Sequence, residues 1–185
     1  MPTFLSLLDK LARWQVVAAL ALPTLGLMAA FNFHPAGVPR LRQLGGGIPP
    51  LDMHFVYGPD EVSSLLTTYG AEGRHHYGLF LAIDMFYAVS YGLFLAALLR
   101  LALRRLGILA TSRWNYLCLL PLGSGAADMT ENATILALLH IYPATPPALV
   151  YVASAATSLK WVLASVSLVL ILALLGLGAL WPKSS

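Results

Sequence analysis

Charged side chains are scarce in this chain, and their scarcity excludes a soluble domain. Only 10% of the residues are charged, whereas 58% are hydrophobic and the mean hydropathy is +0.75. Soluble domains carry about 25% charged residues. A chain of 185 residues with this composition is therefore predicted to be an integral membrane protein.

The sequence also lacks the short motifs that identify common reactions. It has no glycine-rich nucleotide loop, no nucleophile elbow and no His or Cys spacing typical of a metal site. The single cysteine, Cys118, excludes an intramolecular disulfide. We therefore expect no metal site, and the cofactor is unknown. Membrane topology accounts for the basic residues behind the net charge of +3, so we expect no nucleic-acid partner.

Four apolar segments are long enough to cross about 30 Å of hydrocarbon as helices. They are residues 14–33, 78–99, 114–140 and 148–181. Leucines at helical spacing before the first segment predict an amphipathic lead-in that continues into the span, and not a cleaved signal. The expected fold is all-α: a single membrane-embedded four-helix bundle over residues 1–185, with a long extracytoplasmic loop between the first two helices.

The basic residues predict which ends of the spans face the cytoplasm. They precede the first span, surround the second loop and follow the fourth span, at Lys10, Arg13, Arg100, Arg104, Arg105, Arg113 and Lys183. The short loop Ile141–Pro147 has none. The positive-inside rule then places both termini of a multi-pass protein in the cytoplasm, at the cell inner membrane.

The first loop, residues 34–77, is too long to be a plain connection, and such loops usually serve as lids or binding elements. Three glycines and two prolines in 45–50 predict a flexible hinge followed by a stiff turn. A short amphipathic helix should begin at Pro59 and end at Gly70. This segment either caps the outer mouth of the bundle or lies on the lipid headgroups.

Ionisable residues inside the spans are the main clue to function. They are Asp84, Asp128, Glu131 and Lys160. Placing a charged side chain at mid-bilayer costs about 2.5 to 3.5 kcal/mol of insertion free energy. Such residues are therefore found mainly where they form ion pairs or take part in function. They form the candidate catalytic cluster.

Helix register places these groups at one depth, in the outer half of the membrane. An antiparallel hairpin centred near Ala144 brings Lys160 opposite Asp128, and a second hairpin about 106–107 brings Asp84 to the same layer. The small residues in 123–127 should let a neighbouring helix approach closely. Polar and aromatic residues on the inward stripes, or at the outer entrance, are the expected ligand-binding residues: Asn132, Tyr87, Tyr91, Thr157, Trp161, His76 and Arg74.

The charge count of this layer predicts that a proton is held there. Three carboxyl groups around one ammonium leave negative charge uncompensated, so one carboxyl is protonated or another cation enters. Because Lys160 lies at the level of Asp128, Glu131 is expected to be the carboxyl without an ion pair and the proton donor or acceptor. The alternatives are that these residues only hold the helices together, or that they form a subunit interface.

Several motifs together resemble an uncharacterised family of small bacterial four-helix integral membrane proteins. These are Pro50-Leu51-Asp52, Tyr57-Gly58-Pro59-Asp60-Glu61, Tyr69-Gly70-Ala71-Glu72-Gly73-Arg74, Asp84 with Tyr91-Gly92, Asp128-x-x-Glu131-Asn132, Tyr142-Pro143 and Lys160-Trp161. The resemblance covers most of residues 45–161 and implies a fold but no activity. More distantly, the layout is similar to the emopamil-binding-protein (EXPERA-like) superfamily, whose members use carboxylates in an internal cavity to handle a proton or pair with a lipophilic amine.

Three functions follow as hypotheses. The first is binding or acid–base processing of a small amphipathic or isoprenoid-like ligand, or a membrane lipid, at the acidic cluster. The second is a non-catalytic accessory subunit of a larger membrane protein complex, favoured by the missing motifs. The third, a proton-coupled transporter, ranks last because four helices without an inverted repeat suit alternating access poorly.

Overall fold

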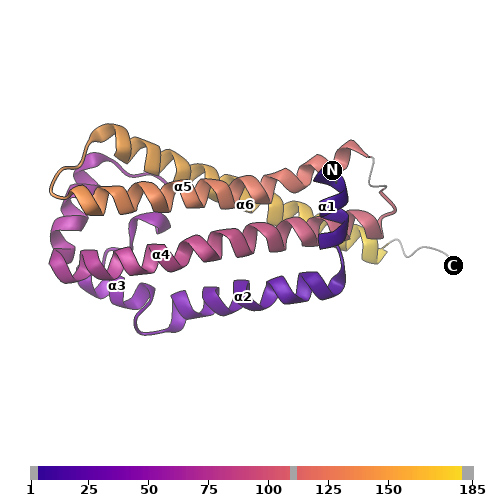
Figure 1. Ribbon diagram of the computed structural model, residues 1–185, viewed down its shortest axis with the longest axis horizontal. Coiled ribbons are helices and arrows are strands. Elements are labelled where there is room, and N and C mark those ends of the chain that lie inside the picture. Colours follow the sequence, from indigo (N-terminus) through magenta and orange to yellow (C-terminus); the bar gives the residue numbers. More distant parts are fainter. Residues whose placement is uncertain (1–3, 109–111, 181–185) are drawn as a thin grey trace.

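The computed structural model describes residues 4–108 and 112–180, and within these ranges all regular structure is helical. Four long helices lie roughly along a common axis (Figure 1): α2 (Trp14–Phe33), α4 (Pro59–Arg105), α5 (Leu119–Ile141) and α6 (Pro147–Leu180). Shorter helices flank or connect them: α1 (Phe4–Leu11), α3 (Val38–Leu44), and the 3-10 helices η1 (Leu51–Met53) and η2 (Arg113–Cys118).

Within the described ranges, three helical segments are long and apolar enough to cross a membrane. They are Trp14–Leu44, which contains α2, together with α4 and Pro147–Gly178 of α6. The most apolar windows of the first and last of these are only 11% buried, so their large apolar side chains face outward. Such a surface is unfavourable in water and suits hydrocarbon. Helix α5 does not meet this criterion, because small and polar residues dilute its apolar sequence.

Most of the expected loop 34–77 is helical, so its description as a loop is wrong. It contains α3, η1 and the first turns of α4, and the amphipathic helix predicted from Pro59 is present. Its apolar face is buried, at Val62, Leu65, Leu66 and Tyr69. Gly70 interrupts α4 with φ 60° and ψ −170°, a conformation that glycine adopts readily. The chain therefore changes direction at one residue, without a loop, and enters the second predicted span.

The lead-in helix does not continue into the first span, contrary to expectation. Arg13 is extended, with φ −103° and ψ 138°, and separates α1 from α2. Arg100 on α4 binds Asp9, with its Nη2 2.7 Å from Oδ1, and Arg104 Nη1 donates to the carbonyl of Ala12 at 3.1 Å. These contacts hold α1 against α4, which requires the chain to turn before α2 begins.

The first and fourth predicted spans agree closely with the helices, whereas α4 extends beyond the second, expected at 78–99, at both ends. Helix α2 has the predicted bounds, and α6 begins and ends within one residue of them. The third span differs because residues Arg113–Cys118 form η2, and the α-helix begins only at Leu119. Ser112 caps η2 by accepting a hydrogen bond from the backbone N–H of Trp114 at 3.4 Å.

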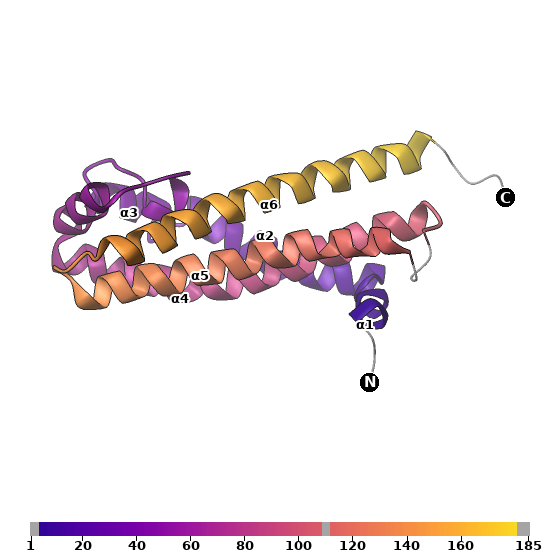
Figure 2. The ribbon, with the colours of Figure 1, turned by 90° about the horizontal axis from the view of Figure 1, so that it is seen from above.

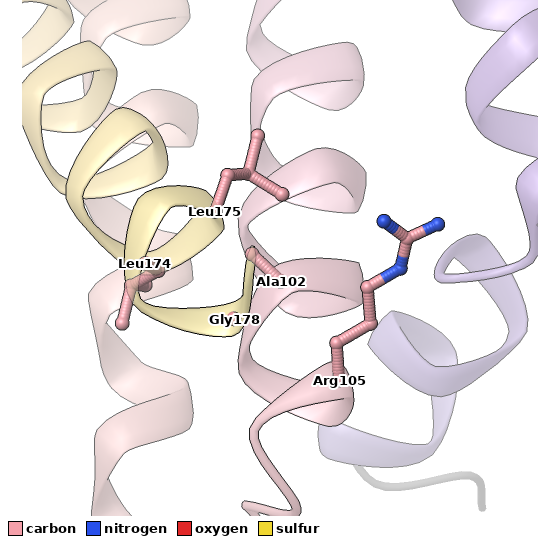
Figure 3. Close-up of a pocket in the computed structure, with 5 residues that line it drawn as sticks. All are labelled: Ala102, Arg105, Leu174, Leu175 and Gly178. Atoms are coloured by element: carbon pink, nitrogen blue, oxygen red, sulfur yellow. The ribbon is translucent and has the colours of Figure 1, made fainter. Parts of the chain in front are cut away.

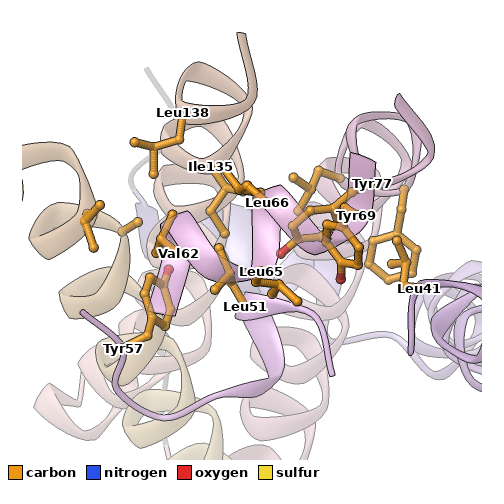
Figure 4. Packing of buried hydrophobic residues seen from close by; sticks show 14 of the residues in the cluster. Leu41, Leu51, Tyr57, Val62, Leu65, Leu66, Tyr69, Tyr77, Ile135 and Leu138 are labelled. Atoms are coloured by element: carbon orange, nitrogen blue, oxygen red, sulfur yellow. The ribbon is translucent and has the colours of Figure 1, made fainter. Parts of the chain in front are cut away.

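The buried apolar residues form two clusters, one at each end of the long helices. Figure 4 shows the larger cluster, where α3, η1 and the first turns of α4 pack against α5. The smaller cluster joins α1, α4, η2 and α6 at the other end. Figure 2 shows that α6 diverges from α4 and α5 toward its C-terminal end. The polar residues of the site lie along the long helices between these clusters.

Helix α5 packs closely against α4 through glycine. A Cβ atom built on Gly125 would lie 2.7 Å from the carbonyl oxygen of Ala88, closer than real side chains tolerate. The Cα of Gly125 is also 3.6 Å from the Cβ position of Gly92 on α4. The expected close approach at 123–127 is therefore present, and it brings the polar face of α5 against α4.

Candidate functional site

Lys160 on α6 contacts two carboxyl groups of α5. Its Nζ lies 3.2 Å from Oδ1 of Asp128 and 2.5 Å from Oε2 of Glu131. The two acids are three residues apart, about one helical turn, so one flexible ammonium reaches both. The side chain of Glu131 is 0% exposed and that of Asp128 is 5% exposed, so both ion pairs are shielded from solvent.

The expectation that Glu131 lacks an ion pair is wrong. Register arguments place backbones at a level, but they do not limit how far a lysine side chain extends along the neighbouring helix. The ammonium lies closer to Glu131 than to Asp128. Glu131 is therefore held by the ammonium of Lys160 at Oε2 and by the hydroxyl of Thr157 at Oε1.

Asp84 on α4 lies in the same layer and contacts α5 through the side-chain amide of Asn132. Asn132 Nδ2 donates to Asp84 Oδ2 at 2.8 Å, and both residues are buried. Among the residues that the structure describes, no cation lies within ion-pair distance of Asp84. The other polar atom of this amide, Oδ1 of Asn132, has no hydrogen-bond partner in the described part of the chain. The layer thus contains a carboxyl group without a cation and an amide oxygen without a donor.

A chain of hydroxyl groups connects Glu131 to the segment outside the long helices. Thr157 on α6 donates to Glu131 Oε1 at 2.5 Å, and the hydroxyl of Tyr57 lies 3.2 Å from Oγ1 of Thr157. Burial raises the pKa of Tyr57 above its ordinary value, and the nearby charges of Glu131 and Asp52 act in the same direction. Tyr57 therefore keeps its proton and can donate it to Thr157, which in turn donates to Glu131.

The segment that carries Tyr57, residues 45–58, is here called the strap. Three side chains of α6 bind its backbone. Ser154 Oγ accepts from the N–H of Tyr57 at 3.0 Å, Ser158 Oγ donates to the carbonyl of Phe55 at 2.7 Å, and Trp161 Nε1 donates to the carbonyl of Asp52 at 3.3 Å. The strap is thus fastened along one face of α6, beside Thr157.

Asp52 of the strap is a fourth buried carboxyl that sequence reasoning missed. Its Oδ1 accepts a hydrogen bond from the hydroxyl of Tyr77 at 2.9 Å, and only 8% of the residue is exposed. Asp52 lies in the expected loop 34–77, and nothing in a loop sequence predicts burial. The available signal was Tyr77, whose place on the inward stripe of α4 requires a polar partner.

Tyr87 and Tyr91 pack between the helices, near the layer. Their rings are 5.2 Å apart, and the ring of Tyr87 meets that of Phe31 on α2 edge to face at 5.6 Å. The hydroxyl of Tyr91 lies 3.0 Å from Oγ of Ser124, which itself donates to the carbonyl of Lys160 at 2.9 Å. Ser124 is a further polar residue that the sequence analysis did not single out.

Arg74 and His76 lie outside the cluster, unlike the other expected ligand-binding residues. Arg74 donates to the carbonyl of Leu66 at 2.9 Å and lies 3.9 Å from the centre of the Tyr142 ring. Its position follows from the break in α4, which leaves carbonyl groups of the preceding turn without helical partners. His76 Nε2 lies 2.6 Å from the carbonyl oxygen of Ala36, so it contacts the connection after α2.

Within the described part of the chain, no group of three His, Cys, Asp or Glu side chains is arranged to hold a metal ion. A pocket of about 140 Å³ lies elsewhere, between the ends of α4 and α6 (Figure 3). Ala102, which lines this pocket, lies about 27 Å along α4 from Asp84 at a rise of 1.5 Å per residue. The chemistry available in the layer is therefore that of carboxyl, ammonium, amide and hydroxyl groups.

No protein-family model, curated protein or solved structure matches this chain. The assignment of function consequently depends on the site itself.

Proposed function

We propose that this is a multi-pass protein of the cell inner membrane in which α2, α4, α5 and α6 all cross the bilayer, with both termini cytoplasmic. The position of α5 supports four spans, since it packs between α4 and α6 and its polar residues face them. The charge distribution supports the orientation. Arginines gather where α4 ends and η2 begins, while the turn between α5 and α6 has none.

The layer around Lys160 binds a small amphipathic or isoprenoid-like molecule, which enters from the outer leaflet beneath the strap and exchanges a proton with a carboxyl group. The observation that carries this function is the excess of buried carboxyl groups over cations. Asp84, Asp128 and Glu131 are all buried, and Lys160 is the only cation among the described residues that contacts any of them. Carboxyl groups collected in this way are typical of sites that hold an exchangeable proton.

The residues take distinct parts in this proposal. Lys160 keeps Asp128 and Glu131 ionised and fixed, so Asp84 is the carboxyl that carries the exchangeable proton. The unpartnered Oδ1 of Asn132 is available to accept a hydrogen bond from the ligand. The resemblance to bacterial four-helix membrane proteins supports the fold in this proposal, and the distant one to the emopamil-binding-protein superfamily supports the kind of ligand.

The test is to identify what copurifies with the protein and whether it depends on Asp84. The wild type is purified in mild detergent and its bound small molecules are extracted and identified by mass spectrometry. Asp84→Asn keeps the shape and the hydrogen bond to Asn132 but cannot exchange the proton. We expect the variant to fold and to lose the ligand, or to lose the pH dependence of its binding. The exposed Asp60, changed to Asn, is the matched control. Full, pH-dependent binding by Asp84→Asn would exclude the proposed role.

The second candidate function is that of an accessory subunit. It is favoured by the outward face of α6, where Val169 and Leu172 are more than 60% exposed. Membrane helices exposed in this way contact either lipid or another protein. Purification separates the two functions: stoichiometric protein partners would support the accessory subunit, and a bound small molecule in an otherwise pure protein would support the first proposal.

A further inference from the structure

The pocket between the ends of α4 and α6 has apolar walls, and the arginine that ends α4 lies beside it. Leu174 and Leu175 of α6 supply alkyl side chains, and Ala102 of α4 and Gly178 of α6 are small enough to leave space between the helices (Figure 3). Arg105, the last residue of α4, lines the same pocket, and its exposed guanidinium points away from Leu174 and Leu175 (Figure 3). A molecule with an apolar chain and an anionic end would match both the apolar walls and the neighbouring guanidinium.

The Arg105 guanidinium has no partner. It forms no hydrogen bond or ion pair with any residue that the structure describes, although its neighbours do. Arg100 binds Asp9, and Arg104 donates to the carbonyl of Ala12. Lys10, Arg13 and Arg113 add positive charge at this end of the molecule, where Asp9 is the only described acid and is already paired. None of the described residues therefore supplies the charge that would complement Arg105.

The depth of the pocket agrees with this reasoning. Both helices are near their ends, since Arg105 closes α4 and Gly178 lies in the last turn of α6. The apolar part of each helix ends here, so the pocket lies where hydrocarbon meets the phosphate groups of a bilayer. Basic pockets between membrane helices at this level bind lipid headgroups. The volume of about 140 Å³ is too small for an entire drug-sized ligand, which needs about 300 Å³ or more, but it suits one end of a chain that continues into the bilayer.

We propose that this pocket is a binding site for an anionic phospholipid, whose phosphate contacts Arg105 and whose acyl chain lies between α4 and the diverging end of α6. The site is separate from the layer around Lys160 and does not depend on the ligand proposed there. Bound lipid would contact both helices and so would hold them together at this end, where α6 diverges from α4 (Figure 2).

The experiment measures lipid retention by native mass spectrometry on the full-length protein. The protein is equilibrated with phosphatidylglycerol or with phosphatidylcholine in the same detergent. We expect phosphatidylglycerol to be retained and phosphatidylcholine not, and Arg105→Gln to weaken retention about tenfold, because it removes a charge-assisted contact to phosphate. Arg113→Gln, an exposed arginine at the same end, is the matched control and should retain the lipid.

A second variant tests the apolar part of the site. A Cβ at Gly178 would have only Leu106 nearby, at 3.8 Å, so Gly178→Leu should be accommodated by filling the pocket and should expel the lipid while Arg105 remains. Thermal unfolding of each variant without lipid shows that it is folded. Equal loss of lipid in Arg113→Gln would show unspecific attraction, and displacement of the lipid by inorganic phosphate at equal concentration would show a simple anion site. Either result would overturn the proposal, as would retention of a stoichiometric acidic protein in place of lipid.

Discussion

The ammonium of Lys160 lies 2.5 Å from Oε2 of Glu131, and this contact joins α6 to α5 at a point where Glu131 is fully buried. Asp128 shares the same ammonium at 3.2 Å. One cation therefore fixes two acids, and each acid depends on it. This dependence allows several outcomes to be predicted from the charges alone.

Lys160→Met should be strongly destabilising. It leaves Asp128 and Glu131 buried without a cation, and breaking a buried ion pair costs about 3 to 5 kcal/mol. We expect a large loss of folded protein and of thermal stability in detergent. The triple variant that also carries Asp128→Asn and Glu131→Gln should recover much of this loss. If the losses of stability caused by the three single substitutions simply add in the triple variant, the three groups do not interact.

Glu131→Gln and Asp84→Asn should differ in their effects on stability. Glutamine at 131 removes the closer of the two anions of Lys160, so thermal stability should fall measurably. Asparagine at 84 removes no ion pair, and the fold should keep nearly its wild-type stability. The comparison is made by thermal unfolding at one pH in one detergent, and the opposite order of stabilities would contradict the assignment.

A larger residue at Gly125 should separate α5 from α4. The Cβ of Gly125→Val would lie 2.7 Å from a backbone oxygen that cannot move aside, and overpacking of this kind costs about 1 to 3 kcal/mol. We expect reduced thermal stability. Gly26→Val on α2 is the matched control, because nothing lies within 4 Å of its Cβ position. Equal effects of the two substitutions would point to helix propensity and not to packing.

The proposed orientation predicts which introduced cysteines are reached from outside the cell. The native Cys118 is buried, so the wild type should give little background labelling. An impermeant thiol reagent should label Thr145→Cys in intact cells and should label Arg105→Cys only after the membrane is opened. Labelling of position 105 in intact cells would reverse the topology and place the Lys160 layer in the inner half of the bilayer.

The long apolar helices and the Lys160–Asp128 contact could be predicted from the sequence because both depend on regular spacing. Apolar runs determine the spans, and counting residues from a turn places Lys160 opposite Asp128. What could not be predicted depends on side-chain reach and on irregular backbone. The extension of Lys160 toward Glu131, the burial of Asp52 and the turn of α1 onto α4 each follow from tertiary contacts that no periodic pattern encodes.

The attachment of the strap has a consequence for how its sequence can vary. Three of the α6 side chains that contact the strap, Ser154, Ser158 and Trp161, bind backbone atoms, and they recur at i, i+4 and i+7 on one face of the helix. Backbone N–H and carbonyl groups are the same for nearly every amino acid. The exposed strap residues 55 and 56 are thus free to change without loosening these bonds, whereas the determinants of the attachment are encoded about 100 residues later, on α6.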